Sequence, residues 1–426
     1  MGELDSGLTA WMLVSASLVL LMTPGLALFY GGMVRGKAVL NMMMMSFGAM
    51  GLVGVIYVLW GWSMSYGEQS FGGLFANPFE QFGLGGGGVF TPEGEAIIED
   101  GLPLIVDVGF QATFAIITVA LISGALAERV KFGTWMVFSG LWVTLAFFPM
   151  AHMVWGGGLL SEDGPFAGIA EPVDFAGGTV VHINAGIAAL VLALVVGKRR
   201  NFGREPMRPH NLPLVMLGAA LLWFGWFGFN AGSAYGADGL AGLAWVNTAT
   251  CAAAAILGWL VTEKIRDGHA TSLGAASGIV AGLVAITPAA GSLTPVGSII
   301  LGLVAGALCA LAVGLKYKFG YDDSLDVVGV HLVGGLVGTV LIGFLATDGG
   351  LFYGGGFELT LVQIIIAVVA MVLSAVVTLV IALALKATMG WRVSDEVEVG
   401  GIDLAVHGEA GYESLGGARV TTEVKA

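Results

Sequence analysis

Long apolar stretches separated by short polar segments fill almost the whole chain. Eleven of them are long enough to cross the hydrocarbon core of a bilayer as a helix, which takes about 20 residues. They cover residues 8–33, 39–63, 102–127, 132–155, 174–197, 212–233, 239–263, 271–290, 293–315, 328–346 and 359–385. The pattern predicts an all-α polytopic membrane protein with 11 transmembrane helices.

Charged residues between the apolar stretches form two alternating sets. All 17 Lys and Arg residues fall in the connections after odd-numbered stretches and in the C-terminal tail. The remaining connections carry carboxylates instead, for example Glu68 and Glu162. Because positively charged loops stay in the cytoplasm, we expect a cell-membrane protein with its N-terminus outside and its C-terminus cytoplasmic.

Composition excludes several classes of protein. Apolar residues make up 57% of the chain and charged residues 11%, which a soluble core does not accommodate. The 69 glycines let apolar helices approach closely, and Cys251 and Cys309 lie in apolar runs, where we expect small packing residues. The sequence lacks phosphate-binding loops, nucleophile elbows and Cys/His metal spacings. It therefore predicts neither an enzyme nor a cofactor, metal or nucleic-acid site.

Two apolar stretches each carry a histidine eight residues after a carboxylate that lies at, or just before, the start of the stretch. The pairs are Asp174 with His182, and Asp323 with His331. Eight helical residues rise roughly 12 Å, so each histidine is expected deep in the membrane. Ionisable groups at that depth are usually functional, and apolar surroundings favour a neutral imidazole, which both donates and accepts hydrogen bonds. Such a pair suits passage of a small polar molecule or relay of a proton. The alternative is two unrelated core histidines, each bonded to a backbone carbonyl.

The expected topology gives the two motifs opposite directions across the membrane. This is typical of an inverted repeat of five plus five spans. We therefore divide the chain into a first half (1–200), a second half (201–350), an unpaired eleventh span (351–385) and a cytoplasmic tail (386–426). The acidic, Gly-rich segment 64–100 is expected to have no fold of its own. The tail is expected either to dock on inner loops or to stay mobile.

Aromatic residues gather where three spans reach the outer side. They include Phe114, Trp155, Trp226 and Phe229, with the hydroxyl of Ser233 close by in sequence. An aromatic belt or core packing explains most such rings. Stacked rings near acidic loops also suit recruitment of a small cation through cation–π contacts.

Carboxylates at the span ends have simpler interpretations. Asp174 is either a cation ligand or, as we favour, a cap for free N–H groups at a helix start. Asp107 and Glu263 are expected to be span-end residues rather than ligands. Glu128 and Arg129 are expected to form an ion pair at the inner face.

Several motifs together resemble the ammonium transporters of the Amt/Mep/Rh superfamily, on the Amt branch. The most specific is Asp174-Phe-Ala-Gly-Gly-Thr-Val-Val-His182-Ile-Asn-Ala-Gly186. Further matching stretches are Thr23–Gly32, Gly124–Arg129, Phe224–Ser233, Gly274–Pro288 and the tail segment His407–Tyr412. The resemblance covers almost the whole chain, with differences in the loop before Asp174 and after Tyr412.

The resemblance implies a homotrimer with one pore in each subunit. Its implied site residues are Phe114, Trp155 and Ser233 for ammonium recruitment, Phe114 and Phe229 for a stacked phenyl gate, His182 and His331 for a pore histidine pair, and Trp226, Asp174 and Asp323 for lining and support. It further implies ammonium or ammonia as substrate, a surrounding membrane lipid and a PII-type signal protein at the cytoplasmic mouth.

The expected function is recruitment and deprotonation of ammonium, followed by passage of ammonia through an apolar pore. Three alternatives stay open. The chain is instead an electroneutral gas channel of the Rh type, an ammonium sensor that signals through its tail, or a membrane redox protein with His182 and His331 as axial haem ligands.

Overall fold

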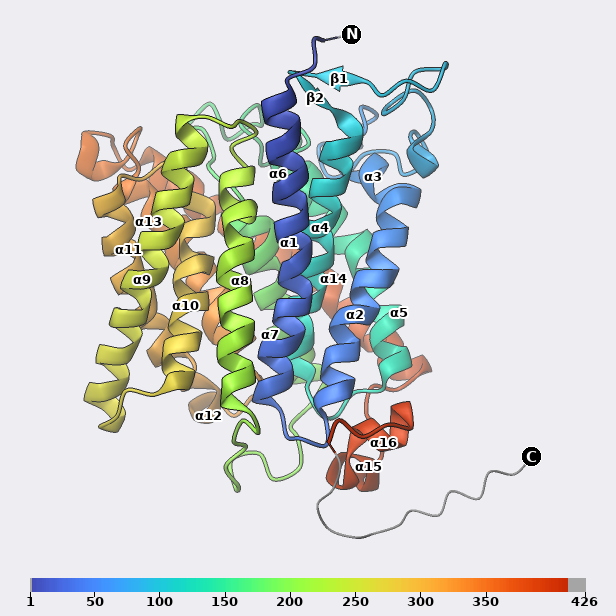
Figure 1. Ribbon diagram of the computed structural model, residues 1–426, viewed down its shortest axis with the longest axis vertical. Helices are drawn as coiled ribbons and strands as arrows, with labels where there is room; N and C mark the ends of the chain where they lie inside the picture. The colour runs from blue at the N-terminus through green and yellow to red at the C-terminus, as the bar shows by residue number, and fades with distance from the viewer. Residues whose placement is uncertain (1, 413–426) are drawn as a thin grey trace.

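The computed structural model describes residues 2–412, and these form a bundle of helices with its two ends capped by loops (Figure 1). Eleven helical segments in this range are long and apolar enough to cross a membrane, which confirms the predicted number. They run Ser6–Met33, Val39–Tyr66, Leu104–Leu126, Phe132–Val154, Gly178–Val196, Leu212–Gly232, Gly239–Asp267, Ser272–Ala289, Pro295–Phe319, Val328–Leu345 and Glu358–Thr388.

Most segments are built from more than one helical element. In chain order, the helices, short helical turns (η) and strands of the first half are α1 (Ser6–Met33), α2 (Val39–Ile56), η1 (Tyr57–Gly61), α3 (Trp62–Tyr66), η2 (Phe82–Leu84), β1 (Ile98–Glu99), β2 (Leu102–Pro103), α4 (Leu104–Ile122), η3 (Ser123–Leu126), α5 (Phe132–Trp142), η4 (Val143–Phe147), α6 (Phe148–Val154), η5 (Gly178–Ile183) and α7 (Asn184–Val196). Those that follow are α8 (Leu212–Gly232), α9 (Gly239–Asp267), α10 (Ser272–Ile286), η6 (Thr287–Ala289), α11 (Pro295–Ala312), α12 (Leu315–Phe319), η7 (Val328–Leu332), α13 (Val333–Leu345), η8 (Leu351–Tyr353), α14 (Glu358–Thr388), α15 (Asp395–Gly400) and α16 (Ile402–His407).

The two ends of the bundle differ in what covers them. The start of α1 and the strands β1 and β2 lie at one end, here the N-terminal end, and α12, α15 and α16 lie at the other, the tail end (Figure 1). The described chain passes between the ends eleven times, so α1 begins at the N-terminal end and α14 finishes at the tail end.

Glycines let neighbouring helices pack backbone against backbone. A Cβ on Gly218 in α8 would overlap the backbone nitrogen of Phe29 in α1, and one on Gly306 in α11 would overlap the carbonyl of Ala255 in α9. In lipid, where burial of apolar surface does not favour one helix partner over another, such close van der Waals contact holds helices together. Cys251 and Cys309 are buried and free, as expected of small packing residues.

The segment between α3 and α4 is ordered, and its regular elements are limited to the short turn η2 and the two-residue strands β1 and β2. Strands β1 and β2 form an antiparallel pair, and the indole N–H of Trp62 donates to the Gln81 side chain at 2.8 Å. These contacts could not be predicted from the Gly-rich composition. They join residues on either side of the glycines, and they depend on the ends of the neighbouring helices.

The described part of the tail docks on the bundle, one of the two outcomes expected from sequence. The Asp403 carboxylate accepts hydrogen bonds from the backbone N–H groups of Leu40 (3.0 Å) and Asn41 (2.8 Å) in the first turn of α2. Ile402 and Trp391 are buried, and the Trp391 indole donates to the carbonyl of Ala382. Residues 413–426 of the predicted tail lie outside the described residues.

A buried ionic cluster joins the loops at the tail end. The Glu128 carboxylate lies 2.5 Å from the guanidinium of Arg35 and 3.5 Å from that of Arg199. Arg199 also pairs with Asp322 at 2.9 Å. The prediction of an ion pair between Glu128 and Arg129 was wrong, because the backbone turns between the two residues and their side chains point to different partners. Glu128 has a positive φ of 71°, and Arg129 instead donates to loop carbonyls such as that of Ala125.

The charge of Glu128 is maintained by its partners. Burial raises the pKa of Glu128, but Arg199 and Arg35 lower it more, so the net shift is downward. A carboxyl with a lowered folded-state pKa stabilises the fold above its unfolded pKa and loses this contribution as pH falls through the folded value. The contribution of Glu128 is therefore complete at neutral pH and declines only below its ordinary value of 4.5.

We predict that Glu128→Gln lowers the free energy of unfolding at neutral pH by about 1–3 kcal/mol, because it removes the counter-charge of the partly exposed Arg35 and one of the two carboxylates that pair with the buried Arg199. Thermal unfolding in detergent, followed by tryptophan fluorescence, measures the change. The difference from the unmodified protein should shrink as pH falls below 4.5.

Asp267→Asn is the matched control, since Asp267 pairs with Arg266 on the surface. Exposed pairs contribute about 0–1 kcal/mol, so this variant should melt like the unmodified protein. Equal melting of the two variants would contradict the structural role given to the Glu128 cluster.

Candidate functional site

The segment that carries His182 begins with a tight carboxylate-capped turn. The Asp174 carboxylate accepts hydrogen bonds from the backbone N–H groups of Gly177 (2.9 Å), Gly178 (2.5 Å) and Thr179 (2.8 Å). The sequence placed the helix start at residue 174, but these bonds hold residues 174–177 outside the helix, which begins at Gly178. The first turn, η5, is a π-helix that ends one residue after His182.

The segment that carries His331 begins in the same way. The Asp323 carboxylate accepts from the N–H groups of Val327 (3.0 Å) and Val328 (2.7 Å), where the π-helical turn η7 begins. Burial raises the pKa of Asp323 to about 6, although Lys316 lowers it. Burial likewise raises the pKa of Asp174 against the opposing effect of its hydrogen bonds from Thr179.

The two motifs share their backbone shape as well as their spacing. The third residue after each carboxylate has a positive φ, 120° at Gly177 and 64° at Asp326. Glycine adopts this region freely, and aspartate is one of the few other residues that tolerate it. Each carboxylate, left-handed residue and histidine therefore occupies the same place in its motif.

The two turns place the histidine rings in direct contact. The Nδ1 atoms of His182 and His331 lie 3.3 Å apart, and the ring centroids are separated by 5.3 Å with planes 28° apart. The rings are only 1% and 3% exposed. A bond between two Nδ1 atoms requires one ring to donate and the other to accept. Nε2 of His182 is buried and has no hydrogen-bond partner among residues 2–412.

Aromatic rings continue the histidine pair toward the N-terminal end. His182 is stacked on Phe229 with centroids 6.2 Å apart, and Phe229 is stacked on Phe114 at 4.1 Å. Trp226 lies beside His182 at 5.5 Å, and its indole N–H donates to the hydroxyl of Thr287 at 2.8 Å. The column of four rings, Phe114, Phe229, His182 and His331, is the site's central feature.

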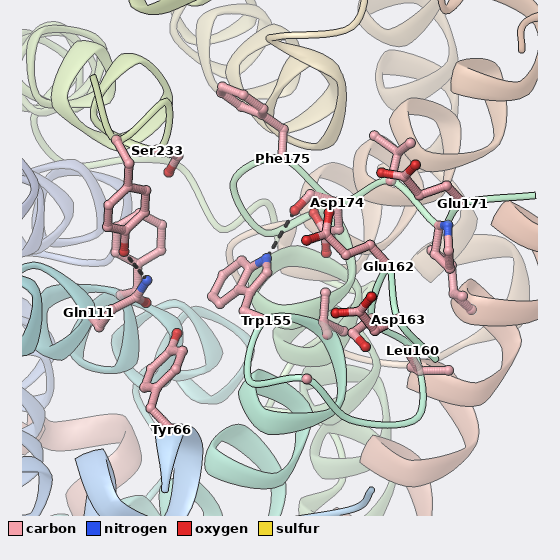
Figure 2. A pocket seen from close by; sticks show the side chains of 18 of the residues that line it. Tyr66, Gln111, Trp155, Leu160, Glu162, Asp163, Glu171, Asp174, Phe175 and Ser233 are labelled. Atoms are coloured by element: carbon pink, nitrogen blue, oxygen red, sulfur yellow. Dashed lines mark hydrogen bonds between the residues drawn. The ribbon is translucent and has the colours of Figure 1, made fainter. Parts of the chain in front are cut away.

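Cavities flank this column. A vestibule of about 600 Å³ opens at the N-terminal end and is bordered by Phe114, Trp155, Asp174 and Ser233 (Figure 2). On the other side of the stacked phenyl rings, a narrow cavity of about 10 Å³ is bordered by Phe229, both histidines and aliphatic side chains. A space of ~10–15 Å³ holds about one water molecule, so the narrow cavity has room for a molecule of that size.

The vestibule floor is fixed by hydrogen bonds to backbone carbonyls. The indole N–H of Trp155 donates to the carbonyl of Asp174 at 3.0 Å (Figure 2), and the hydroxyl of Ser233 donates to that of Phe229 at 2.8 Å. Trp155 meets Phe114 edge to face with centroids 5.9 Å apart. Because the Ser233 proton is used, its oxygen is free to accept a hydrogen bond from a donor in the vestibule.

The structure brings together the aromatic residues, the serine and the two histidines that the sequence assigned to the site, namely Phe114, Trp155, Trp226, Phe229, Ser233, His182 and His331. Asp174 and Asp323 contact the starts of the two turns rather than the rings. Asp107, expected to be a simple span-end residue, lines the vestibule. Sequence reasoning missed Thr287 and Tyr235, whose only signal is a hydroxyl near a span end.

The chain is similar to known proteins over almost its whole length. Residues 10–412 match the model of the Ammonium Transporter Family. The chain belongs to the ammonium transporter family. This is a family of transporters rather than of enzymes, as the sequence predicted.

Related transporters match over nearly their full length. An ammonium transporter of Mycobacterium tuberculosis is 55% identical, covering 97% of this chain and 91% of that protein. One from Aquifex aeolicus is 48% identical, covering 96% and 94%. The crystal structure of Saccharomyces cerevisiae Mep2 has a TM-score of 0.81 at 32% identity, covering 92% of this chain and 91% of that one. A structure described as a sensor Amt protein has a TM-score of 0.85 at 28% identity, covering 94% and 98%.

The geometry of this ammonium transporter argues against the haem alternative. The histidine rings touch each other, and the cavity beside them measures about 10 Å³, so a porphyrin does not fit between them. Among residues 2–412, no group of three or more His, Cys, Asp or Glu side chains is arranged to hold a metal ion.

We predict that Gly186→Ala disrupts the histidine contact. A Cβ at Gly186 in α7 would lie 2.5 Å from the backbone nitrogen of Leu332, next to His331. Relief of this overlap must move η7 away from α7 and lower the free energy of unfolding by about 1–3 kcal/mol. The melting temperature in detergent and ammonium flux into proteoliposomes should both fall.

Gly51→Ala serves as the control, because nothing lies within 4 Å of a Cβ at Gly51 in α2. This variant should match the unmodified transporter in both measurements. Normal flux through Gly186→Ala would show that the spacing of the two turns is unimportant.

Proposed function

We propose that the transporter recruits ammonium in its vestibule, that ammonium loses a proton as it leaves water for the ring column, and that ammonia then passes along the histidine pair. The ring column supports this proposal most strongly. It connects an open, acidic vestibule to a cavity of about 10 Å³ lined by apolar groups and two imidazoles. The proton either returns outside or crosses separately.

Recruitment rests on Phe114, Trp155 and Ser233. Aromatic faces attract a cation within about 6 Å, and the serine oxygen accepts an N–H bond. Potassium has a similar size but no N–H group, so hydrogen-bond acceptors give the site a basis for preferring ammonium. Phe114 and Phe229, stacked at 4.1 Å, act as the gate that excludes water.

Deprotonation follows from the surroundings beyond the gate. Desolvating an ion costs several kcal/mol unless a partner compensates for it, and the described residues around the narrow cavity include no carboxylate. A neutral ammonia molecule avoids this cost. The contacting imidazoles present both a donor and an acceptor to it, and Trp226 restricts the path beside them.

The orientation and assembly are part of the same proposal. We place the N-terminal end outside the cell and the tail end in the cytoplasm, since all the basic connections share the tail end. The halves 1–200 and 201–350 form the inverted repeat, which the matching capped turns support. We further propose a homotrimer in the cell membrane that binds a PII-type protein at the tail end.

We predict that replacing both pore histidines, His182→Ala with His331→Ala, lowers the ammonium-evoked current by about a hundredfold, the loss typical when a proton-transferring group is removed. Currents from proteoliposomes on a supported membrane measure this, with potassium as the competing ion. His269→Ala, at an exposed histidine, is the control and should carry the normal current. Persisting ammonium current with unchanged selectivity over potassium would show that the two imidazoles do not carry the proton that crosses separately. Ammonia flux without current in the unmodified protein would favour an electroneutral gas channel.

A further inference from the structure

One face of α4 carries a line of side chains that leads down to the phenyl gate. Asp107, Gln111 and Phe114 are spaced four and three residues apart, so they share a face of the helix. All three border the vestibule. The seven residues from Asp107 to Phe114 correspond to about 10 Å of rise. The carboxylate of Asp107 and the amide of Gln111 therefore lie one after the other along α4, between the N-terminal end of the bundle and the Phe114 ring of the gate.

Tyr235, which follows the end of α8, fixes the two polar members of this line. Its hydroxyl donates to Asp107 Oδ1 at 2.6 Å and accepts from Gln111 Nε2 at 2.7 Å. Its ring meets Phe110 edge to face with centroids 5.8 Å apart. Among residues 2–412, no further hydrogen bond reaches Asp107 Oδ2 or Gln111 Oε1, so both oxygens remain free to accept.

Tyr66 adds a third acceptor to the same vestibule. Its hydroxyl is shielded from solvent and has no hydrogen-bond partner within residues 2–412. In Figure 2, Tyr66 and Gln111 lie on one side of Trp155, and Asp174 and Phe175 lie on the other. The wall formed by Tyr66, Asp107, Gln111 and Tyr235 is therefore separate from the capping carboxylate of Asp174, whose oxygens already accept backbone N–H bonds.

We propose that this wall is a docking subsite that holds ammonium before it reaches Phe114, Trp155 and Ser233. Ammonium offers four N–H donors and no acceptor, and the wall offers acceptor oxygens with one negative charge. Asp107 and Gln111 contact the cation, and Tyr235 is a positioning residue that orients both. The proposal rests on the ammonium transport proposed above and adds a second set of residues that determines affinity.

The position of the subsite predicts which kinetic quantity it controls. It lies on the vestibule side of the phenyl gate, away from the histidine pair, so it should set the concentration that half-saturates transport and leave the maximal rate almost unchanged. Acceptor oxygens that match N–H donors should also favour ammonium over potassium in competition.

The test measures ammonium-evoked current against ammonium concentration in proteoliposomes on a supported membrane. Asp107→Asn removes the charge and should raise the half-saturating concentration about tenfold, with the maximal current kept. Tyr235→Phe removes the hydroxyl that orients both Asp107 and Gln111 and should raise the half-saturating concentration about threefold, equivalent to one weakened hydrogen bond to the cation. Glu162→Gln is the matched control, because Glu162 is an exposed carboxylate bordering the same vestibule; it should change the value less than about twofold.

Each result bears on the subsite separately from the transport function. Equal effects of Asp107→Asn and Glu162→Gln would overturn the proposal, since only the summed charge would then matter. So would a lower maximal current at an unchanged half-saturating concentration. If Asp107→Asn fails to fold, Tyr235→Phe decides, and an unchanged half-saturating concentration in that variant overturns the proposal. Absence of ammonium transport by the unmodified protein would instead refute the proposed function.

Discussion

The contact between two buried imidazoles is the interaction on which the site depends. It holds Nδ1 of His182 at 3.3 Å from Nδ1 of His331, inside apolar walls that do not compensate a charge. Neither ring lies in a regular α-helical turn. Each is carried instead by a π-helical turn whose free N–H groups are tied to a carboxylate, Asp174 in one case and Asp323 in the other. Insertions of this kind are frequent at functional sites in helices.

The rest of the bundle keeps these turns close and dry. Small residues such as Gly186 allow the backbones beside the histidines to approach, and stacked phenyl rings separate the narrow cavity from the vestibule. At the tail end, the ionic cluster around Glu128 and Arg199 ties together loops that precede and follow the histidine-bearing spans. Asp403 adds the tail to this assembly through the start of α2. The charged groups Asp174, Asp323, Glu128 and Asp403 therefore all lie in or next to the loops where helices begin or end, outside the apolar middle of the spans.

Sequence predicted the parts of this structure that depend on local patterns. The eleven spans follow from apolar runs, and the equal spacing from Asp174 to His182 and from Asp323 to His331 identified the motifs that meet. What sequence could not supply were contacts between distant residues. Glu128 and Arg129 contact other residues and not each other, because Glu128 has a positive φ. The position of Asp107 in the vestibule depends on Tyr235, 128 residues away. The fold of segment 64–100 depends on helix ends that support it.

The proposed ammonia path depends on two neutral imidazoles that share one hydrogen bond between their Nδ1 atoms. Nitrogen-15 NMR of the histidine-labelled transporter in lipid bilayers at neutral pH measures this directly, with His182→Ala and His331→Ala used for assignment. The account predicts one ring protonated at Nδ1 and the other at Nε2, with a scalar coupling between the two Nδ1 nitrogens. Two rings in the same tautomer without coupling, or a cationic imidazole at either position, would contradict it.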